Sequence, residues 1–236
     1  FLANFKICLI GMAMLVTPGG AGMLIKSHFL KKKFGLSISK TAPTVFAERY
    51  HDFLALTTIL IFSLIFTFTI EAAISGVIAF VLLIIVYIIF TNNKWLKKIE
   101  EKIRKIKFFK NSFPANLEIT NSVNSLKTRN SMISGWLIST ILWSIDAIAI
   151  YFGFVAFNLE IGIFEAVQIF FTALMYGTIS FLPAGIGVTE GVFIGLLLSN
   201  NLELSIATSL ILFIRLTTIW FYTLLGFIAL KLTIKR

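Results

Sequence analysis

An all-α bundle that crosses a membrane several times is indicated by the composition, the long uncharged runs and the placement of basic residues. Of the 236 residues, 58% are hydrophobic and only 14% are charged, and the mean hydropathy is +0.93. A soluble domain carries about 25% charged residues, and a core of this size cannot hide every long apolar run. The composition therefore excludes a soluble globular protein, a disordered chain and a fibrous repeat.

The apolar segments predict the helices in chain order. The first makes about half a crossing, and the next two are each about long enough for the ~30 Å hydrocarbon layer. Two later segments are longer, and each contains one charged residue. One further segment stops at a Pro-Gly tract and is followed by a short apolar run. The segments are 1–16, 53–70, 72–91, 131–157, 164–182, 188–199 and 204–230.

The cysteine content and the first residues exclude further classes of protein. Cys8 is the only cysteine, which excludes a disulfide framework and a multi-cysteine metal site. The chain opens at the apolar Phe1 without the basic start or small-residue cleavage site of a signal peptide. We therefore expect an N-terminally truncated fragment that lacks the first helices of a longer protein.

Three basic clusters predict which ends of the helices face the cytoplasm. They comprise Lys31 to Lys33, the eight Lys/Arg of 94–110, and the C-terminal Lys231, Lys235 and Arg236. The positive-inside rule places all three on the cytoplasmic side of a multi-pass protein of the cell membrane. Both ends of segment 164–200 then lie outside, so this segment must enter the membrane and return as a re-entrant hairpin. Non-helical backbone at such depth requires burial in protein or a polar cavity.

The loop between the two halves is basic and then polar. Apolar residues at 3–4 spacing within 94–109 alternate with charges, which is typical of an amphipathic helix on the inner leaflet. A solvated linker helix explains the pattern equally well. Residues 111–130 are rich in Ser and Asn and are expected to be a linker.

Two parts of the chain resemble each other, which predicts an inverted repeat within a single membrane domain, residues 1–236. Residues 17–22 read T-P-G-G-A-G and residues 181–187 read F-L-P-A-G-I-G. Arg49 lies 31 residues after Pro18, and Arg215 lies 32 after Pro183. The repeats are expected at about 1–92 and 131–236, joined by 94–130. If the turns after the two breaks lie on opposite sides of the membrane, the repeats are inverted, and inverted repeats with broken helices are typical of many secondary transporters. The alternative is that the two tracts are similar by chance.

The Pro-Gly tracts are expected to end helices. Proline removes an amide donor and glycine permits positive φ. Free N–H groups at the start of each return helix would then favour an anion. For Gly191 and Gly195 the four-residue spacing favours close helix packing instead. The predicted break residues are Pro18, Gly20, Gly22, Pro183, Gly185 and Gly187.

Arg215 is the strongest candidate for a functional charge. It is the only charged residue within 204–230, and a cation at the bilayer centre costs about 2.5–3.5 kcal/mol or more unless it faces a cavity or a partner. Asp146 and Glu190 are candidate partners. An arginine can hold a lipid phosphate through its planar donors; a buried ion pair that only fixes packing is the alternative.

The first repeat carries its own charges. Glu48 and Asp52 are four residues apart on one helix face, and Arg49 is three before Asp52. They are candidates for headgroup binding, or they are solvated at the inner interface. His51 is expected to be interfacial. Lys26 follows the first break, where it would steer headgroups or simply snorkel.

Enzyme and cofactor signatures are missing from the sequence. It contains no G-x-S-x-G, H-E-x-x-H, Walker A or G-x-G-x-x-G motif and no Cys/His cluster. We expect no catalytic residue, no cofactor and no metal site. The positive net charge fits the cytoplasmic rule and anionic lipid, with no nucleic-acid partner.

The chain resembles a known family through three tracts. These are T-P-G-G-A-G at 17–22, E-R-x-x-D at 48–52 and L-P-x-G-x-G-x-x-E at 182–190. They resemble the lysylphosphatidylglycerol synthase transmembrane region, a flippase-like family of integral membrane proteins. The resemblance implies a lipid-translocating domain whose substrate is a polar, anionic or aminoacylated membrane phospholipid made by a separate lipid-modifying enzyme. Met23 and Lys26 depart from the family pattern, in which an acid and an arginine are common.

Two other functional classes stay open. One is a non-transporting membrane scaffold or subunit for a lipid- or glycan-modifying enzyme, in which the 94–110 surface matters and the midplane charges do not. The other is an intramembrane transferase that uses Glu190 or Asp146 as a base. A homo-oligomer is compatible with each class.

Overall fold

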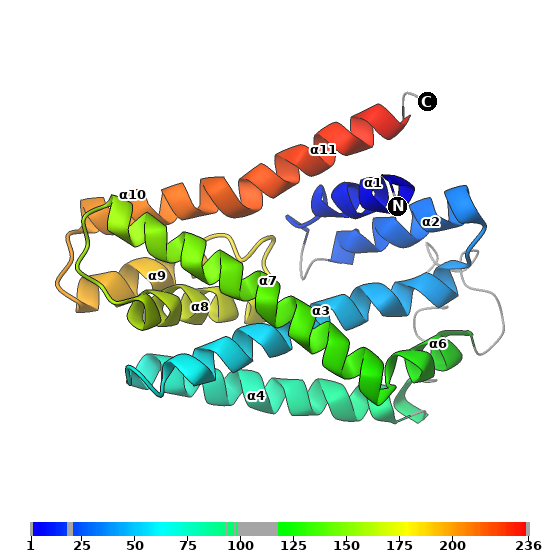
Figure 1. Ribbon diagram of the computed structural model, residues 1–236, viewed down its shortest axis with the longest axis horizontal. Helices are drawn as coiled ribbons and strands as arrows, with labels where there is room; N and C mark the ends of the chain where they lie inside the picture. Colours follow the sequence, from blue (N-terminus) through cyan, green and yellow to red (C-terminus); the bar gives the residue numbers. More distant parts are fainter. Residues whose placement is uncertain (1, 18–20, 93, 97, 99–117, 235–236) are drawn as a thin grey trace.

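The computed structural model describes residues 2–17, 21–92, 94–96, 98 and 118–234, and within them the chain is helical with no strand. Three helices are long and apolar enough to cross a membrane. They are α4 (Ile70–Thr91), α7 (Arg129–Ala156) and the continuous helix Leu204–Thr233. The predicted all-α membrane fold is confirmed. Figure 1 shows most helices running along the long axis of the molecule.

The N-terminal half contains α1 (Leu2–Met12), η1 (Ala21–Leu24), α2 (Ile25–Phe34), α3 (Ile38–Ser63) and α4. The helix α2 ends at Gly35, whose φ of 68° is left-handed and whose amide bonds the Lys31 carbonyl oxygen. Because Ser37 starts a new helix immediately afterwards, α2 and α3 form a hairpin, as Figure 1 shows.

The predicted segment 53–70 is wrong in its bounds. The helix α3 begins 15 residues earlier, at Ile38, and ends at Ser63. The polar stretch before residue 53 is helical and its charges are paired, Glu48 with Lys26 of α2 and Arg49 with Asp52 of α3 itself. Residues 64–69 form a turn that α8 holds: the Gln168 amide donates to the Thr67 carbonyl oxygen (2.5 Å) and accepts from the Thr69 hydroxyl (2.8 Å).

The C-terminal half begins with a short surface helix. Its elements are α6 (Glu118–Leu126), α7, α8 (Ile163–Ile179), α9 (Val188–Ser199), α10 (Leu204–Arg215), the π-helical η2 (Leu216–Trp220) and α11 (Phe221–Ile234). The expected linker 111–130 is therefore wrong for residues 118–126, where Thr120 and Val123 are buried and α6 packs on α3. The expected amphipathic helix 94–109 lies mostly outside the described residues.

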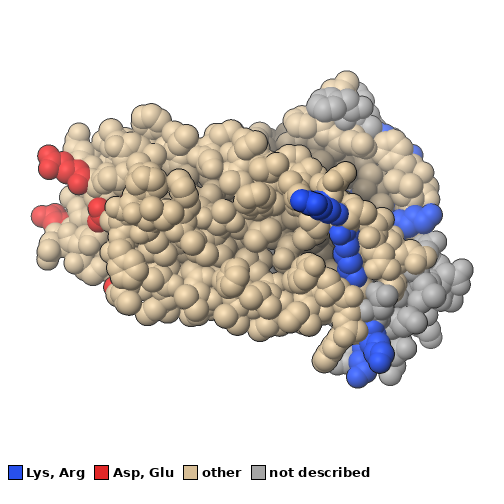
Figure 2. All heavy atoms as spheres, turned by 60° about the horizontal axis from the view of Figure 1, so that its bottom comes forward, with Lys and Arg blue, Asp and Glu red and all other residues tan. Residues whose placement is uncertain are grey.

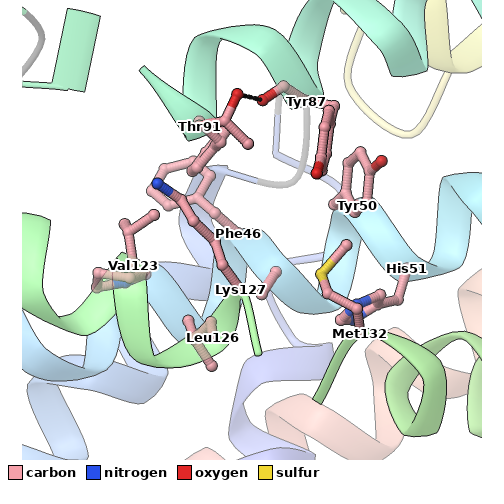
Figure 3. Close-up of a pocket in the computed structure, with 12 residues that line it drawn as sticks. Phe46, Tyr50, His51, Tyr87, Thr91, Val123, Leu126, Lys127 and Met132 are labelled. Atoms are coloured by element: carbon pink, nitrogen blue, oxygen red, sulfur yellow. Dashed lines mark hydrogen bonds between the residues drawn. The ribbon is translucent and has the colours of Figure 1, made fainter. Parts of the chain in front are cut away.

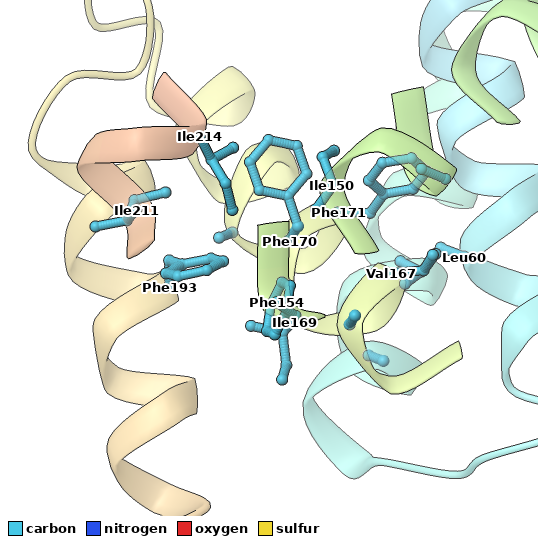
Figure 4. Close-up of a cluster of buried hydrophobic side chains, with 14 of the residues drawn as sticks. Leu60, Ile150, Phe154, Val167, Ile169, Phe170, Phe171, Phe193, Ile211 and Ile214 are labelled. Atoms are coloured by element: carbon cyan, nitrogen blue, oxygen red, sulfur yellow. The ribbon is translucent and has the colours of Figure 1, made fainter. Parts of the chain in front are cut away.

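The core lies where α7, α8, α9 and α10 meet. Phe154, Phe171 and Phe193 are fully buried there, and Figure 4 shows Ile150, Phe170 and Ile214 among them. Aromatic rings of this size dominate the energetics of a core. The opposite face of α7 is apolar and exposed, and this is the expected surface for contact with lipid.

The ends of the chain pack together. The helix α1 lies beside α11 (Figure 1), and α11 approaches closely at Gly226. A Cβ added there would lie 2.7 Å from the Ala13 Cα atom, so only glycine fits. The first and last helices therefore share one interface, which brings the two predicted repeats into contact.

Charges separate along the long axis of the molecule. Figure 2 shows acidic side chains at one end and basic side chains at the other. Glu71, Glu160 and Glu203 are exposed at turns near the start of α4, the end of α7 and the start of α10. Lysines lie in the last turns of α2 and α11. The two ends of the bundle thus differ in charge, as the sequence-based assignment of sides requires.

Candidate functional site: a pocket beside the Pro-Gly tracts

The second Pro-Gly tract forms the break between α8 and α9. Gly185 and Gly187 have φ of 65° and 85°, so the prediction that glycine permits positive φ is confirmed at both. Ala184 also has a positive φ of 54°, a conformation that strains a residue with a side chain. A Cβ at Gly185 would lie 2.9 Å from the Gly177 Cα atom of α8. The break is consequently closed tightly against the helix that precedes it.

Glu190 and Arg215 tie this break to α10. The Arg215 Nε donates to Glu190 Oε1 (2.7 Å), and its Nη2 donates to the Ala184 carbonyl oxygen (2.6 Å). Arg215 is 3% exposed. Of the two partners expected for Arg215, Glu190 is the one that the structure places in contact with it.

The expected free amides at the start of α9 are not found at Gly187. Its N–H donates to Glu190 Oε2 (2.7 Å), so the Glu190 side chain caps the helix start. The Glu190 carboxylate therefore occupies the position in which the sequence analysis expected an external anion. Chemically, Glu190 is an internal anion held by a guanidinium and a backbone amide.

The first break differs from the second. Pro18 and Gly20 lie outside the described residues. Gly22 lies in η1 without positive φ, so the expected role of left-handed backbone is wrong for this glycine. Its amide donates to Thr17 Oγ1 (2.8 Å), and a Cβ would collide with the Thr17 and Met14 side chains. Close packing, not backbone conformation, requires glycine here.

Arg49 and Asp52 form an ion pair along α3. Arg49 Nη2 lies 2.7 Å from Asp52 Oδ2, and the Ser139 hydroxyl of α7 donates to Asp52 Oδ1 (3.0 Å). Arg49 Nε is buried and has no hydrogen-bond partner among the described residues. This arginine therefore retains an unused donor, which a ligand reaches only when the side chains around it move.

Lys26 and Glu48 form a third pair, between α2 and α3. Lys26 Nζ donates to Glu48 Oε2 (2.7 Å), and Lys26 is 9% exposed. Its side chain crosses α1 at Gly11, where any added Cβ would collide with it. Lys26 is thus buried and paired, so the snorkelling alternative is not what the structure shows.

A pocket of about 280 Å³, walled mainly by apolar side chains with a few charged and polar groups among them, lies between the two breaks. A volume of this order is at the lower end for small-molecule sites and suits a headgroup better than a whole lipid. Residues from α3, α7, α8, α9, α10 and η2 line it, together with residues at the start of the first Pro-Gly tract and within the second. They include Thr17, Arg49, Asp52, Trp143, Gly185, Thr189 and Arg215.

The structure brings some of the predicted site residues together and leaves others apart. Arg49, Asp52, Gly185 and Arg215 line the pocket. Glu190 acts on it through Arg215. The Lys26–Glu48 pair, Pro183 and Gly187 do not line it, and no group of three or more metal-ligating side chains occurs in the described part of the chain.

Asp146 stands apart from the three ion pairs. It lies on α7, half-buried, and within the described chain its carboxylate has no hydrogen-bond or ion-pair partner. It is close enough to Asp52 and Tyr222 to interact with both electrostatically. The expected Asp146–Arg215 pair is therefore not formed.

The structure contradicts the packing role that the sequence predicted for Gly191 and Gly195. Both lie on an exposed face of α9, and a Cβ at either position would meet no atom within 4 Å. The prediction that they allow close helix packing is wrong within the described structure. The close approach occurs at Gly177 and Gly185 instead.

Three pocket-associated residues escaped the sequence analysis: Ser139, Trp143 and Thr189. Ser139 and Trp143 lie four residues apart on α7, and Asp146 follows three later, so one helix face carries all three. That spacing could have identified Ser139 and Trp143 as pocket residues from the sequence. Thr189 is fully buried and its hydroxyl has no partner; a single threonine beside a Pro-Gly tract gives no such signal.

Comparison with known proteins identifies the family of this chain. The profile of the lysylphosphatidylglycerol synthase transmembrane region matches residues 1–226. The chain belongs to this family. The resemblance carried by the three tracts is thereby confirmed, and the Arg215–Glu190 pair joins the last of those tracts to α10.

Curated relatives of the chain include archaeal membrane proteins. A UPF0104 membrane protein of Pyrococcus horikoshii is 27% identical over 236 residues, which cover 89% of this chain and 70% of the relative. One of Methanothermobacter thermautotrophicus is 25% identical, covering 96% of this chain and 74% of the relative. A third, of Methanocaldococcus jannaschii, is 28% identical and covers 89% of each. No solved structure matches the chain.

Proposed function

We propose that this membrane protein moves a phospholipid with a polar headgroup across the bilayer. The headgroup binds in the pocket between the two breaks, and the acyl tails stay in the surrounding lipid. The pocket that joins Arg49, Asp52 and Arg215 to both Pro-Gly tracts carries the proposal. Ionisable residues at membrane depth that face a cavity commonly mark a substrate path.

Displacement of Glu190 is the proposed binding step. A lipid phosphate carries the same kind of acceptor oxygens as the Glu190 carboxylate, and arginine binds both in the same planar geometry. When the phosphate replaces Glu190 at Arg215, the Gly187 amide is released as a further donor. Arg49 Nε supplies a donor from the other repeat.

Alternating access from an inverted repeat supports the same function. Arg49 and Arg215 are each the twelfth residue of their helices, α3 and α10. In each half an ion pair links a return helix to the following long helix: Lys26 to Glu48, and Glu190 to Arg215. The polarity of these pairs is reversed between the halves. Two halves of opposite orientation would rock about one midplane site.

The charge separation supports a cell-membrane protein with its basic end in the cytoplasm. Figure 2 shows the basic side chains gathered at one end, and the positive-inside rule assigns that end to the cytoplasm. A headgroup would then enter the pocket from the leaflet where a lipid-modifying enzyme acts.

Reconstitution tests the proposal. Purified protein in liposomes should accelerate transbilayer movement of fluorescent phosphatidylglycerol, read by dithionite quenching. We expect Arg215→Ala to slow this movement at least about tenfold, the effect of losing about 1.4 kcal/mol of binding in the rate-limiting complex. Lys231→Ala, a charge removed outside the pocket, is the control. A fluorescent phosphatidylethanolamine tests a zwitterionic headgroup in parallel. If the wild type moves neither lipid, the proposal is wrong.

A membrane scaffold for a separate lipid-modifying enzyme is the second candidate. The exposed basic residues at one end of the bundle favour it, because they form a surface on which an acidic partner could dock. Under this alternative, Arg215→Ala leaves lipid modification in cells unchanged, whereas neutralising the lysines at 31–33 abolishes it. An intramembrane transferase would instead yield a covalently altered lipid with the purified protein alone.

A further inference from the structure

A second pocket lies at the basic end of the bundle, between α3, α4, α6 and α7 (Figure 3). Its walls are mainly apolar side chains. They include Pro43, Phe46 and Ala47 of α3, Phe90 of α4, Leu126 of α6 and Met132 of α7. It shares no lining residue with the central pocket. The two sites therefore lie on different faces of α3.

One polar group without a partner borders this apolar slot. His51 is 7% exposed, and its Nε2 is buried with no hydrogen-bond partner among the described residues. The His51 ring fits against α7 only because residue 135 is glycine, where a Cβ would come within 2.5 Å of the imidazole. The Tyr50 ring packs edge-on against His51. A mostly apolar pocket with a few convergent polar groups is the usual form of a ligand site.

Lys127 supplies the charge at this pocket. Figure 3 shows its side chain between Val123 and Leu126 on one side and Met132 on the other. Within the described residues its ammonium donates one hydrogen bond, to the neutral Asn124 amide oxygen (3.1 Å). Burial without an acidic partner lowers the pKa of Lys127, and a bound anion would counter that effect.

The size and position of the slot indicate which kind of ligand it can bind. Its volume of about 60 Å³ holds a short stretch of a hydrocarbon chain and is too small for a helix of a partner protein, which is about 10 Å wide. It lies at the end where the basic side chains gather, a position at which lysine attracts anionic lipid. Tyr50 and Tyr87 fit the interfacial level at which tyrosine is enriched.

We propose that this slot binds one anionic phospholipid of the leaflet at the basic end. A short stretch of one acyl chain lies between α3, α4 and α7, and the phosphate binds Lys127. The bound lipid seals α6 against α3. This site is distinct from the translocation pocket, so it stands whether or not the protein moves lipids.

Lipid-resolved native mass spectrometry tests the site. The protein is titrated in micelles with dioleoyl phosphatidylglycerol or, separately, with dioleoyl phosphatidylcholine. We expect one phosphatidylglycerol to bind more tightly than all others. Lys127→Gln should weaken it about fivefold, the effect of one interfacial lysine. Ala47→Phe, which fills the slot, should abolish it.

Lys231→Gln is the matched control, because it removes one charge at the same end outside the slot. Its affinity should equal that of the wild type. The site is refuted if Lys127→Gln binds like the wild type, if phosphatidylcholine binds equally tightly, or if both lysine variants weaken binding alike. Lys127→Gln decides the question even where Ala47→Phe fails to fold. Arg215→Ala should leave this binding intact, which separates it from translocation.

Discussion

Glu190 has two roles at the level of the single residue. It caps α9 through the Gly187 amide and neutralises Arg215, and its side chain is 23% exposed beside an arginine side chain that is 4% exposed. An arginine at membrane depth is tolerated when a partner or a cavity receives it. Here both conditions hold, because Arg215 binds Glu190 and lines the pocket.

Glu190→Ala should destabilise the protein by about 3 kcal/mol, because it leaves Arg215 buried without its acid. The SDS-induced unfolding free energy in mixed micelles measures this loss. The double variant Glu190→Ala/Arg215→Met should lose less than the sum of the two single changes. Strict additivity would contradict a direct interaction between the two side chains.

Asp146 and Asp52 make a matched pair of acids. Asp52 has Arg49 and Ser139 as partners, whereas Asp146 has none within the described residues. We expect Asp146→Asn to leave stability unchanged or raised, because an unpaired charge beside another carboxylate is unfavourable. Asp52→Asn should lower it by up to about 1 kcal/mol, since the Arg49 partner is partly exposed. Thermal unfolding in micelles measures both; the reverse order would contradict the assigned contacts.

The hairpin of α8 and α9 is the element on which the site depends. Four residues of its break, Phe181, Ala184, Gly185 and Gly187, have positive φ, and the break packs against Gly177. The π-helical turn η2 begins directly after Arg215, a feature that often occurs at functional sites. Both irregularities lie beside the same pocket.

Gly185→Ala should destabilise this hairpin by about 1–3 kcal/mol, because an L side chain is strained at that φ and would press on the α8 backbone. Gly191→Ala is the control. It sits on the same hairpin in open space and should be neutral or stabilising by up to about 1 kcal/mol. The midpoint of SDS unfolding distinguishes the two. Equal effects would mean that the break is not as tight as the contacts indicate.

At the scale of the whole molecule, apolar length and charge placement were enough to predict the fold class and most helices. The sequence analysis placed Glu48, Arg49 and Asp52 on a helix, but the apolar run alone put the start of its segment at residue 53, whereas α3 begins at Ile38. The helix α6 was missed because its burial against α3 is a tertiary effect. In the site, the matched arginines were found by spacing. Thr189 and the internal capping by Glu190 depend on backbone geometry that no pattern encodes.

The mirrored arrangement of the two breaks is the central claim, and accessibility labelling in sealed vesicles tests it most directly. On a Cys8→Ser background, Lys32→Cys reports the turn after α2, and Asn201→Cys reports the turn after α9. A membrane-impermeant maleimide added outside oriented vesicles should label one position and reach the other only after permeabilisation. Labelling of both positions from the same side would contradict the inverted repeat and the alternating access built on it.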